Sequence, residues 1–177
     1  MTRLGARALV DLVLDDGSFT SWDDPALPVV PWRDTARYRE ERYAAIDLTG
    51  YRDYREFQTP GALPLYREMI VTGAWWDLVD PIATKRLAPL FAGRPESMRK
   101  KMRSWSRSRD IWVRRSSILC QLKLKEKTDV DLLFDCIRPS MRQKEFFLRK
   151  AIGWALREYA KTDARAVARF VSRHETE

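Results

Sequence analysis

The stretch WWDLVD at residues 75–80 follows a strongly apolar run and precedes Pro81. It sets two adjacent tryptophans beside two carboxylates, Asp77 and Asp80. An aromatic surface next to a fixed negative charge suits a ligand group that is both cationic and aromatic. A structural role is the alternative, because tryptophan pairs at helix ends commonly anchor a core, and Asp80 before Pro81 could cap a helix. The hexapeptide alone favours the structural role.

The sequence on both sides of this stretch has a helical pattern. Only 7 of 177 residues are glycine, and apolar residues recur every three or four positions, which indicates helices rather than strands. Short helices with short joins pair as antiparallel hairpins. We expect caps at Thr128-Asp129 and Thr162-Asp163. The expected helices cover residues 37–49, 62–73, 75–91, 96–107, 110–125, 130–138, 143–160 and 163–172.

Three tryptophans suggest a repeat. Trp76, Trp112 and Trp154 are separated by 36 residues (76 to 112) and 42 residues (112 to 154). A spacing near 40 residues is typical of HEAT-type helical repeats. We therefore predict an all-α fold in which antiparallel helix pairs stack as a HEAT-like α-solenoid over residues 35–177, with these tryptophans on one face. Residues 1–34 would form a separate segment ending in a proline-containing linker.

Positive charge is concentrated in the second half of the chain. The formal net charge of +8 divides into −3 over residues 1–98 and +11 over residues 99–177. Such a balance favours a polyanionic partner, with nucleic acid first and an anionic membrane surface second, although a merely solvated basic face is the alternative.

The window 99–115 holds eight bases, one acid and two tryptophans. Basic side chains with interleaved aromatics suit contacts to phosphates and bases, and arginine suits bidentate phosphate contact. Solvated arginines and two core tryptophans would explain the window equally well. The candidate DNA-binding residues are Arg99, Lys100, Lys101, Arg103, Arg107, Arg109, Trp112, Arg114 and Arg115.

Other residues narrow the possible chemistry. Cys120, Cys136 and His174 are the only cysteines and histidine, so no zinc-type spacing exists and Ser-His or Cys-His catalysis is nearly excluded. The sequence leads us to expect no signal peptide, and it contains no apolar run of membrane-spanning length. We expect a monomeric, cytoplasmic protein without a metal or cofactor.

Gly153 inside a helix costs about 1 kcal/mol against alanine, so we expect a backbone or a ligand to approach closely there, beside Trp154.

Four motifs, kept in order and spacing, resemble the DNA alkylation repair enzymes of the AlkD type. They are WWDLVD at 75–80, IWVRR at 111–115, ILCQLKLK at 118–125 and KEFFLRKAIGWALREYAK at 144–161. The similarity runs from about residue 37 to about residue 171. It implies HEAT-like repeats and a glycosylase that removes cationic N3- or N7-alkylated purines from duplex DNA without a metal. It also implies that Trp76, Asp80, Arg115 and Trp154 line the active cleft.

The residue types suit that chemistry. Breaking the glycosidic bond of a cationic purine builds positive charge on the deoxyribose, which the carboxylate of Asp80 would stabilise while orienting the attacking water. Trp76 and Trp154 would hold the lesion by π contact, and Arg115 would clamp a phosphate.

The sequence departs from the family in two places. Members normally begin with several further helices, whereas residues 1–24 here resemble the start of acyl-CoA carboxylase carboxyltransferase subunits, from which we infer no activity. We therefore expect an amino-terminally truncated cleft. A catalytically impaired remnant that only binds DNA, and a helical scaffold for a protein partner, are the alternatives to a glycosylase.

The second departure is Pro81, which disfavours the α conformation at Asp80. Asp80 could then stand at a helix start.

Overall fold

The computed structural model describes residues 36, 38–91 and 95–174. These residues form helices and no strand, which confirms the all-α class. The predicted segment 1–34 lies outside the described residues. None of the described helices is long and apolar enough to cross a membrane. The α-helices are α2 (Arg39–Leu48), α3 (Leu63–Gly73), α4 (Trp76–Pro81), α5 (Pro95–Trp105), α6 (Ile111–Leu119), α7 (Val130–Ile137) and α8 (Phe146–His174).

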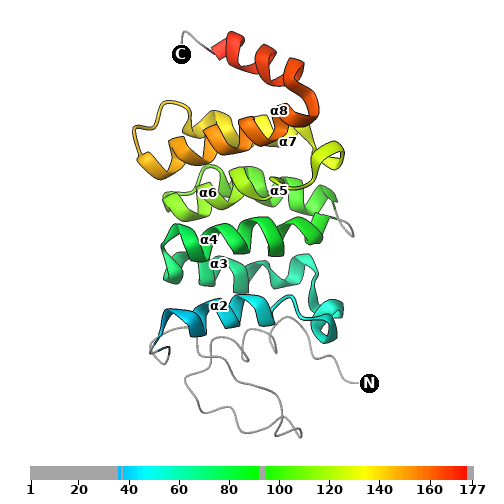
Figure 1. Ribbon diagram of the computed structural model, residues 1–177, viewed down its shortest axis with the longest axis vertical. Coiled ribbons are helices and arrows are strands. Elements are labelled where there is room, and N and C mark those ends of the chain that lie inside the picture. The colour runs from blue at the N-terminus through cyan, green and yellow to red at the C-terminus, as the bar shows by residue number, and fades with distance from the viewer. Residues whose placement is uncertain (1–35, 37, 92–94, 175–177) are drawn as a thin grey trace, which may run out of the picture.

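The helices stack into an elongated helical-repeat solenoid (Figure 1). Along one row, α2 contacts α4, α4 contacts α6, and α6 contacts α8; in the other row α5 lies against α7. The pairs α3–α4 and α5–α6 join the two rows. Successive helices of one row therefore come from sequence segments roughly 35 residues apart, which allows residues of neighbouring repeats to meet across each seam.

The helix that contains Asp80 begins earlier than Pro81 suggests. Trp75, with extended backbone (φ −152°), precedes α4, and Asp80 lies inside the helix. Proline removes a backbone N–H, and the chain continues from α4 into a π-helical segment, Ile82–Leu87, and a 3-10 turn, Ala88–Phe91. A wider turn is one way in which a helix absorbs such a lost hydrogen bond. The interpretation of Asp80 as a cap or a helix start is therefore wrong.

Both predicted aspartate caps are confirmed. The Asp129 carboxylate accepts a hydrogen bond from the Leu132 N–H (3.1 Å), at the start of α7. The Asp163 carboxylate accepts one from the Ala166 N–H (2.9 Å), and the non-helical backbone of Asp163 divides α8 into two helices. Figure 1 shows the second part of α8 turning away from the first part. The expected boundary near residue 162 was therefore right.

The core lies between the two rows, where apolar faces of successive helices are removed from water. On α8, Leu148, Ala151 and Ala155 form the buried stripe. Burial raises the pKa of Cys136 to about 12 and raises that of Cys120 well above its ordinary value. Both thiols therefore stay protonated at neutral pH, which disfavours a role as nucleophile.

Replacing Asp163 with alanine should lower the free energy of unfolding by about 1 kcal/mol, because the amide of Ala166 loses its acceptor. Urea unfolding followed by circular dichroism measures this change. Asp163→Asn keeps a capping oxygen and should stay close to wild type. Equal unfolding midpoints for Asp163→Ala and wild type would show that the cap does not stabilise the second part of α8.

Candidate active site

A buried ion pair stands at the centre of the candidate site. Arg115 of α6 donates from Nε to Asp80 Oδ1 and from Nη2 to Asp80 Oδ2, each at 2.7 Å. The exposed fractions of the two side chains are only 6% and 10%. Arg115 Nη1 also donates to the backbone carbonyl of Phe147. One guanidinium therefore joins α4, α6 and the start of α8.

The predicted phosphate contact of Arg115 stays a prediction. Asp80 and the Phe147 carbonyl take three of the five N–H donors of the guanidinium, which leaves one N–H on Nη1 and one on Nη2. The sequence did not predict the partner Asp80, a carboxylate on the neighbouring helix, 35 residues earlier in the sequence. Counting its backbone as well as its side chain, Asp80 is 7% exposed. A carboxylate has about four lone-pair positions, so two remain for a water molecule or a sugar.

Three aromatic rings pack beside this ion pair. The ring centres of Trp75 and Trp112 are 6.1 Å apart, those of Trp75 and Phe147 are 5.5 Å apart, and those of Trp112 and Phe147 are 4.9 Å apart. One ring comes from the start of each of α4, α6 and α8. Such pairs contribute about 0.5–1.5 kcal/mol each beyond area burial. This aromatic cluster therefore fixes the three helix starts relative to one another.

The aromatic cluster corrects the expected repeat. Trp76, Trp112 and Trp154 are the first, second and ninth residues of their helices, so they do not occupy equivalent points. Trp112 is only 7% exposed, so its predicted contact with DNA would need it to leave the core. The equivalent positions are instead Trp75, Trp112 and Phe147, separated by 37 residues (75 to 112) and 35 residues (112 to 147). Because Trp75 and Trp76 are adjacent, the sequence did not show which of the two is equivalent to Trp112.

Trp76 and Trp154 differ from Trp112 in being accessible. Trp76 is 49% exposed and precedes Asp80 by four residues in the same helix, so the two share a face. Trp154 is half-buried and lies two turns beyond Phe147 on α8. An exposed indole beside a fixed carboxylate can hold a cationic ring, as the sequence predicted for these residues. Their roles remain a prediction.

A second ion pair ties α2 to α4. Arg39 Nε donates to Asp77 Oδ2 at 2.7 Å, and the Tyr43 hydroxyl also donates to this carboxylate. The hydrogen bonds from Arg39 lower the pKa of Asp77, and the hydrogen bond to Asp77 raises the pKa of Tyr43. The stabilisation from Asp77 is therefore present above its ordinary pKa and is lost as the pH falls through the lowered value. Sequence analysis missed this cluster, since only the helical spacing of Arg39 and Tyr43 hinted at it.

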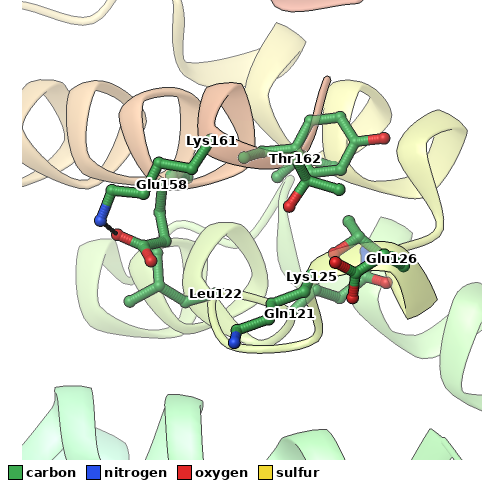
Figure 2. Close-up of a pocket in the computed structure, with 11 residues that line it drawn as sticks. Gln121, Leu122, Lys125, Glu126, Glu158, Lys161 and Thr162 are labelled. Atoms are coloured by element: carbon green, nitrogen blue, oxygen red, sulfur yellow. Dashed lines mark hydrogen bonds and ion pairs between the residues drawn. The ribbon is translucent and has the colours of Figure 1, made fainter. Parts of the chain in front are cut away.

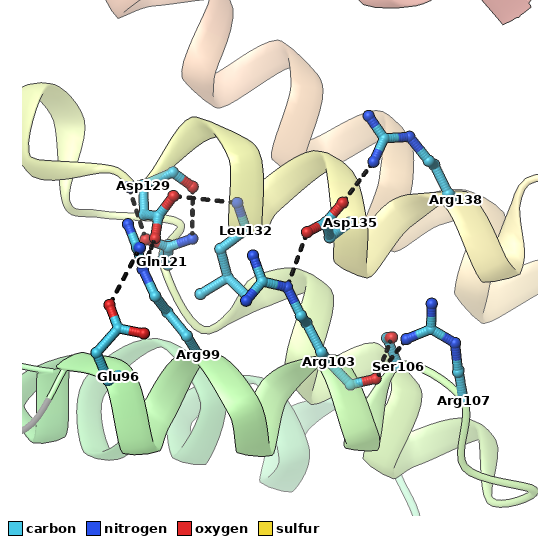
Figure 3. A network of polar contacts seen from close by, with 10 residues as sticks. All are labelled: Glu96, Arg99, Arg103, Ser106, Arg107, Gln121, Asp129, Leu132, Asp135 and Arg138. Carbon is cyan, nitrogen blue, oxygen red and sulfur yellow. Dashed lines mark hydrogen bonds and ion pairs between the residues drawn. The ribbon is translucent and has the colours of Figure 1, made fainter.

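Part of the positive charge of residues 99–115 is neutralised by acids elsewhere in the chain, which the sequence of this window did not indicate. Figure 3 shows Arg99 paired with Asp129, and Arg103 paired with Asp135 at 2.8 Å. The hydrogen bond with Asp135 raises the pKa of Arg103. These acids lie on or at the start of α7, so they neutralise part of α5. Arg99 and Arg103, two of the cations that the sequence assigned to DNA, therefore join α5 to α7, and their contact with DNA stays a prediction.

The other cations of residues 99–115 either donate hydrogen bonds to backbone carbonyls or have no carboxylate partner among the described residues. Arg107 donates to the carbonyl of Arg103 at 3.1 Å, and Arg114 donates to that of Ser108 at 2.7 Å. Lys100, Lys101 and Arg109 are exposed and have no carboxylate partner among the described residues.

A cavity of about 370 Å³ lies between the turn after α6 and α8, and its lining residues do not include Asp80 or Trp154. Figure 2 shows Lys161 and Glu158 on one wall, where they form an ion pair of 2.6 Å. Lys125, on the opposite wall, has a positive φ of 50°. No group of described residues is arranged to hold a metal ion.

The comparisons with known proteins agree with this fold. The family model of DNA alkylation repair enzymes matches residues 32–177. The chain belongs to the DNA alkylation repair enzyme family. A solved structure described as a predicted DNA alkylation repair enzyme from Enterococcus faecalis is 32% identical, with a TM-score of 0.65. The similarity covers 76% of this chain and 62% of that chain. No curated protein matches the sequence.

Membership in the DNA alkylation repair enzyme family supports a role in DNA repair. The chain spans less than two thirds of the length of the Enterococcus faecalis relative. For this family member the structure places a carboxylate and an exposed tryptophan in one helix, with an arginine from the next repeat holding the carboxylate. The reaction that this arrangement supports is proposed below.

Breaking the buried ion pair should destabilise the protein strongly. Asp80→Asn or Arg115→Met alone should lower the free energy of unfolding by about 3–5 kcal/mol, because each leaves a buried charge or polar group without its partner. The double variant Asp80→Asn/Arg115→Met removes both charges and should be more stable than the sum of the two single changes predicts. Urea unfolding of all variants tests this. Strict additivity would mean that the two side chains do not depend on one another.

Proposed function

We propose that this protein is a monofunctional alkylpurine DNA glycosylase that hydrolyses the N-glycosidic bond of cationic N3- or N7-alkylated purines in duplex DNA. The observation that supports this most is the carboxylate of Asp80, held by Arg115 and one helical turn from the exposed ring of Trp76. We further propose that it acts as a cytoplasmic monomer and that its partner is double-stranded DNA.

The proposed reaction needs electrostatic stabilisation more than proton transfer to the base. An alkylated purine already carries a positive charge, so it leaves with the bonding electrons as a neutral base. Positive charge then develops at the sugar carbon, where a preorganised carboxylate lowers the barrier. Water adds to that carbon and loses a proton, for which Asp80 is the acceptor. Arg115 fixes the carboxylate in one orientation, so little reorganisation is needed during the reaction.

The tryptophans would contribute binding rather than chemistry. A cation over an indole gains about 0.5–2 kcal/mol, depending on how far it is removed from water. Trp76 is half exposed before substrate binds, so DNA can bury it. Trp154 would contact the lesion or its sugar from α8. This arrangement would favour cationic purines over neutral ones, because a neutral ring forgoes both the cation–π attraction and the attraction to Asp80.

A second candidate function is DNA binding without catalysis. It is favoured by the ion pair itself, because Arg115 already compensates the charge of Asp80. A carboxylate that is paired in this way stabilises developing positive charge less than a free one does. This candidate predicts DNA binding with no release of base.

The test is release of free 7-methylguanine from alkylated duplex DNA, measured by chromatography and mass spectrometry. Wild type should release the base. Trp76→Ala should slow release by about tenfold, which corresponds to roughly 1.4 kcal/mol, and should leave stability nearly unchanged because Trp76 is exposed. Tyr51→Ala, which removes another half-exposed aromatic ring after α2, is the matched control and should act as wild type does.

Asp80→Asn should abolish release, but its result counts only where circular dichroism shows a folded protein, since Asp80 also stabilises the fold. No release by folded wild-type protein that still binds DNA would reject the glycosylase and favour the binding function. Equal release by Trp76→Ala and wild type would remove Trp76 from the site.

A further inference from the structure

A cavity of about 550 Å³ lies at the edge of the solenoid where α4 and α6 end. Its walls come from the π-helical segment and 3-10 turn after α4, from the first residues of α5, and from the turns between α6 and α7. Figure 1 shows these turns at the opposite edge from the start of α8. We use the name edge groove for this cavity. Its lining residues do not include Trp76, Asp80 or Trp154, so it is separate from the candidate active site.

Part of the lining of the edge groove is apolar. Ala88, Phe91 and Leu124 are half-buried lining residues, whereas Pro89 and Pro95 are exposed ones. Covering apolar surface that water still reaches contributes about 25 cal/mol per Å², so an apolar side chain of a partner gains free energy here. The volume lies within the range of roughly 300–1,000 Å³ that is common for ligand sites. The edge groove is therefore large enough to accept a side chain from outside.

Cations border this apolar lining. Lys85 and Lys127 are exposed lining residues from two different repeats, and Lys85 belongs to the π-helical segment, a wide turn of a kind that is frequent at functional sites. Arg99 lines the groove too, but it is paired with Asp129, the one carboxylate among the lining residues. Lys85 and Lys127 differ from other exposed lysines in bordering the same apolar cavity. The edge groove therefore attracts a partner that is both acidic and apolar.

The uncharged polar groups of the edge groove are already hydrogen-bonded within the chain. The side-chain amide of Gln121 donates to the carbonyl of Asp129 at 3.1 Å and accepts from its N–H at 2.9 Å. The Thr84 hydroxyl donates to the carbonyl of Asp80 at 2.8 Å. A sugar–phosphate backbone would find few further donors and would leave the apolar lining uncovered. A peptide with carboxylates beside a large apolar side chain matches both features, because such anchors fill pockets while charges stay at the rim.

We propose that the edge groove docks an acidic peptide segment of a partner protein. An aromatic or aliphatic side chain of the segment packs on the apolar lining, and its carboxylates lie beside Lys85 and Lys127. Ala88 follows Asp80 by eight residues, which is roughly 12 Å of helix at 1.5 Å per residue. Docking therefore requires neither Asp80 nor Trp76, and the inference is independent of the proposed glycosylase.

The test begins with selection of short random peptides from a phage library on the immobilised full-length protein. The selected peptides should combine aspartate or glutamate with tryptophan, phenylalanine or leucine. A fluorescein-labelled synthetic copy of the most enriched peptide should bind the protein in solution, as measured by fluorescence anisotropy, and should bind more weakly at high salt because part of the attraction is electrostatic. Selection of peptides without acidic residues, or of none, would overturn the inference.

Two groove variants then locate the bound peptide. Lys85→Glu/Lys127→Glu reverses the charge at two exposed positions and should weaken binding about tenfold or more, because like charges across an interface repel. Ala88→Arg, checked for folding by circular dichroism, places a long side chain in the apolar lining and should weaken binding to a similar extent. The matched control, Lys100→Glu/Lys101→Glu, makes the same charge change on exposed residues outside the groove and should bind as wild type does. Equal losses in the control and in the charge-reversed groove variant would reject docking at the groove, as would full binding by the latter.

DNA as the occupant predicts a different result. An undamaged duplex would then displace the labelled peptide from wild type, and it would bind the charge-reversed groove variant more weakly than the control variant. That result would assign the edge groove to nucleic acid and reject a peptide. A duplex that leaves the peptide bound supports the inference.

Residues 11–24 of the chain are another possible source of acidic peptide, since they are acidic and contain Phe19 and Trp22. If they occupied the groove, Asp15→Asn/Asp16→Asn would weaken their competition, and the labelled peptide would bind this variant more tightly than it binds wild type. Tighter binding would assign the groove to residues 11–24 of this chain or of a second copy, and would reject a separate partner. Equal binding to the variant and to wild type supports the partner.

Discussion

The buried pair of Asp80 and Arg115 is the constraint on which the candidate site depends. Removing two charges from water costs several kcal/mol per ion, and only excellent geometry with further hydrogen bonds compensates this cost. Both conditions are met here, because the guanidinium donates twice to the carboxylate and once to the carbonyl of Phe147. The pair therefore exists only while α4, α6 and α8 keep their stacking. The carboxylate proposed for chemistry is oriented by the repeat architecture itself.

The aromatic cluster of Trp75, Trp112 and Phe147 acts on the same three helices. It packs their starts together, while the ion pair joins them through polar contacts. Fold and function consequently share residues at this point, and a substitution at Asp80 or Arg115 changes stability as well as chemistry. Trp76 is more informative about function, because half of its side chain is exposed and the fold depends on it less.

Some cations of the solenoid are paired with carboxylates within the protein, and others are exposed without such a partner among the described residues. Arg99 and Arg103 form ion pairs with acids on or at the start of α7, and these pairs join α5 to α7 (Figure 3). Arg149, Lys150 and Arg157 point away from the core and have no such partner among the described residues. Affinity for a polyanion comes from cations that release its counterions, and an internal ion pair weakens that contribution. Total charge therefore overstates how many cations are available to a polyanionic partner, because part of it is paired within the protein.

The sequence by itself determined most helix positions, the caps at Asp129 and Asp163, and the family, although the helix expected over residues 110–125 ends at Leu119. These features depend on apolar periodicity, on hydrogen bonds spanning three residues and on ordered motifs, all of which are local along the chain. The tertiary structure alone decided that Arg115 faces Asp80, that Trp112 is buried with Trp75 and Phe147, and that α7 neutralises part of α5. Each of these contacts joins residues about 30 or more positions apart, across a seam between helices. Periodicity shows which face of a helix is buried, but it does not show which side chain a neighbouring helix presents to that face.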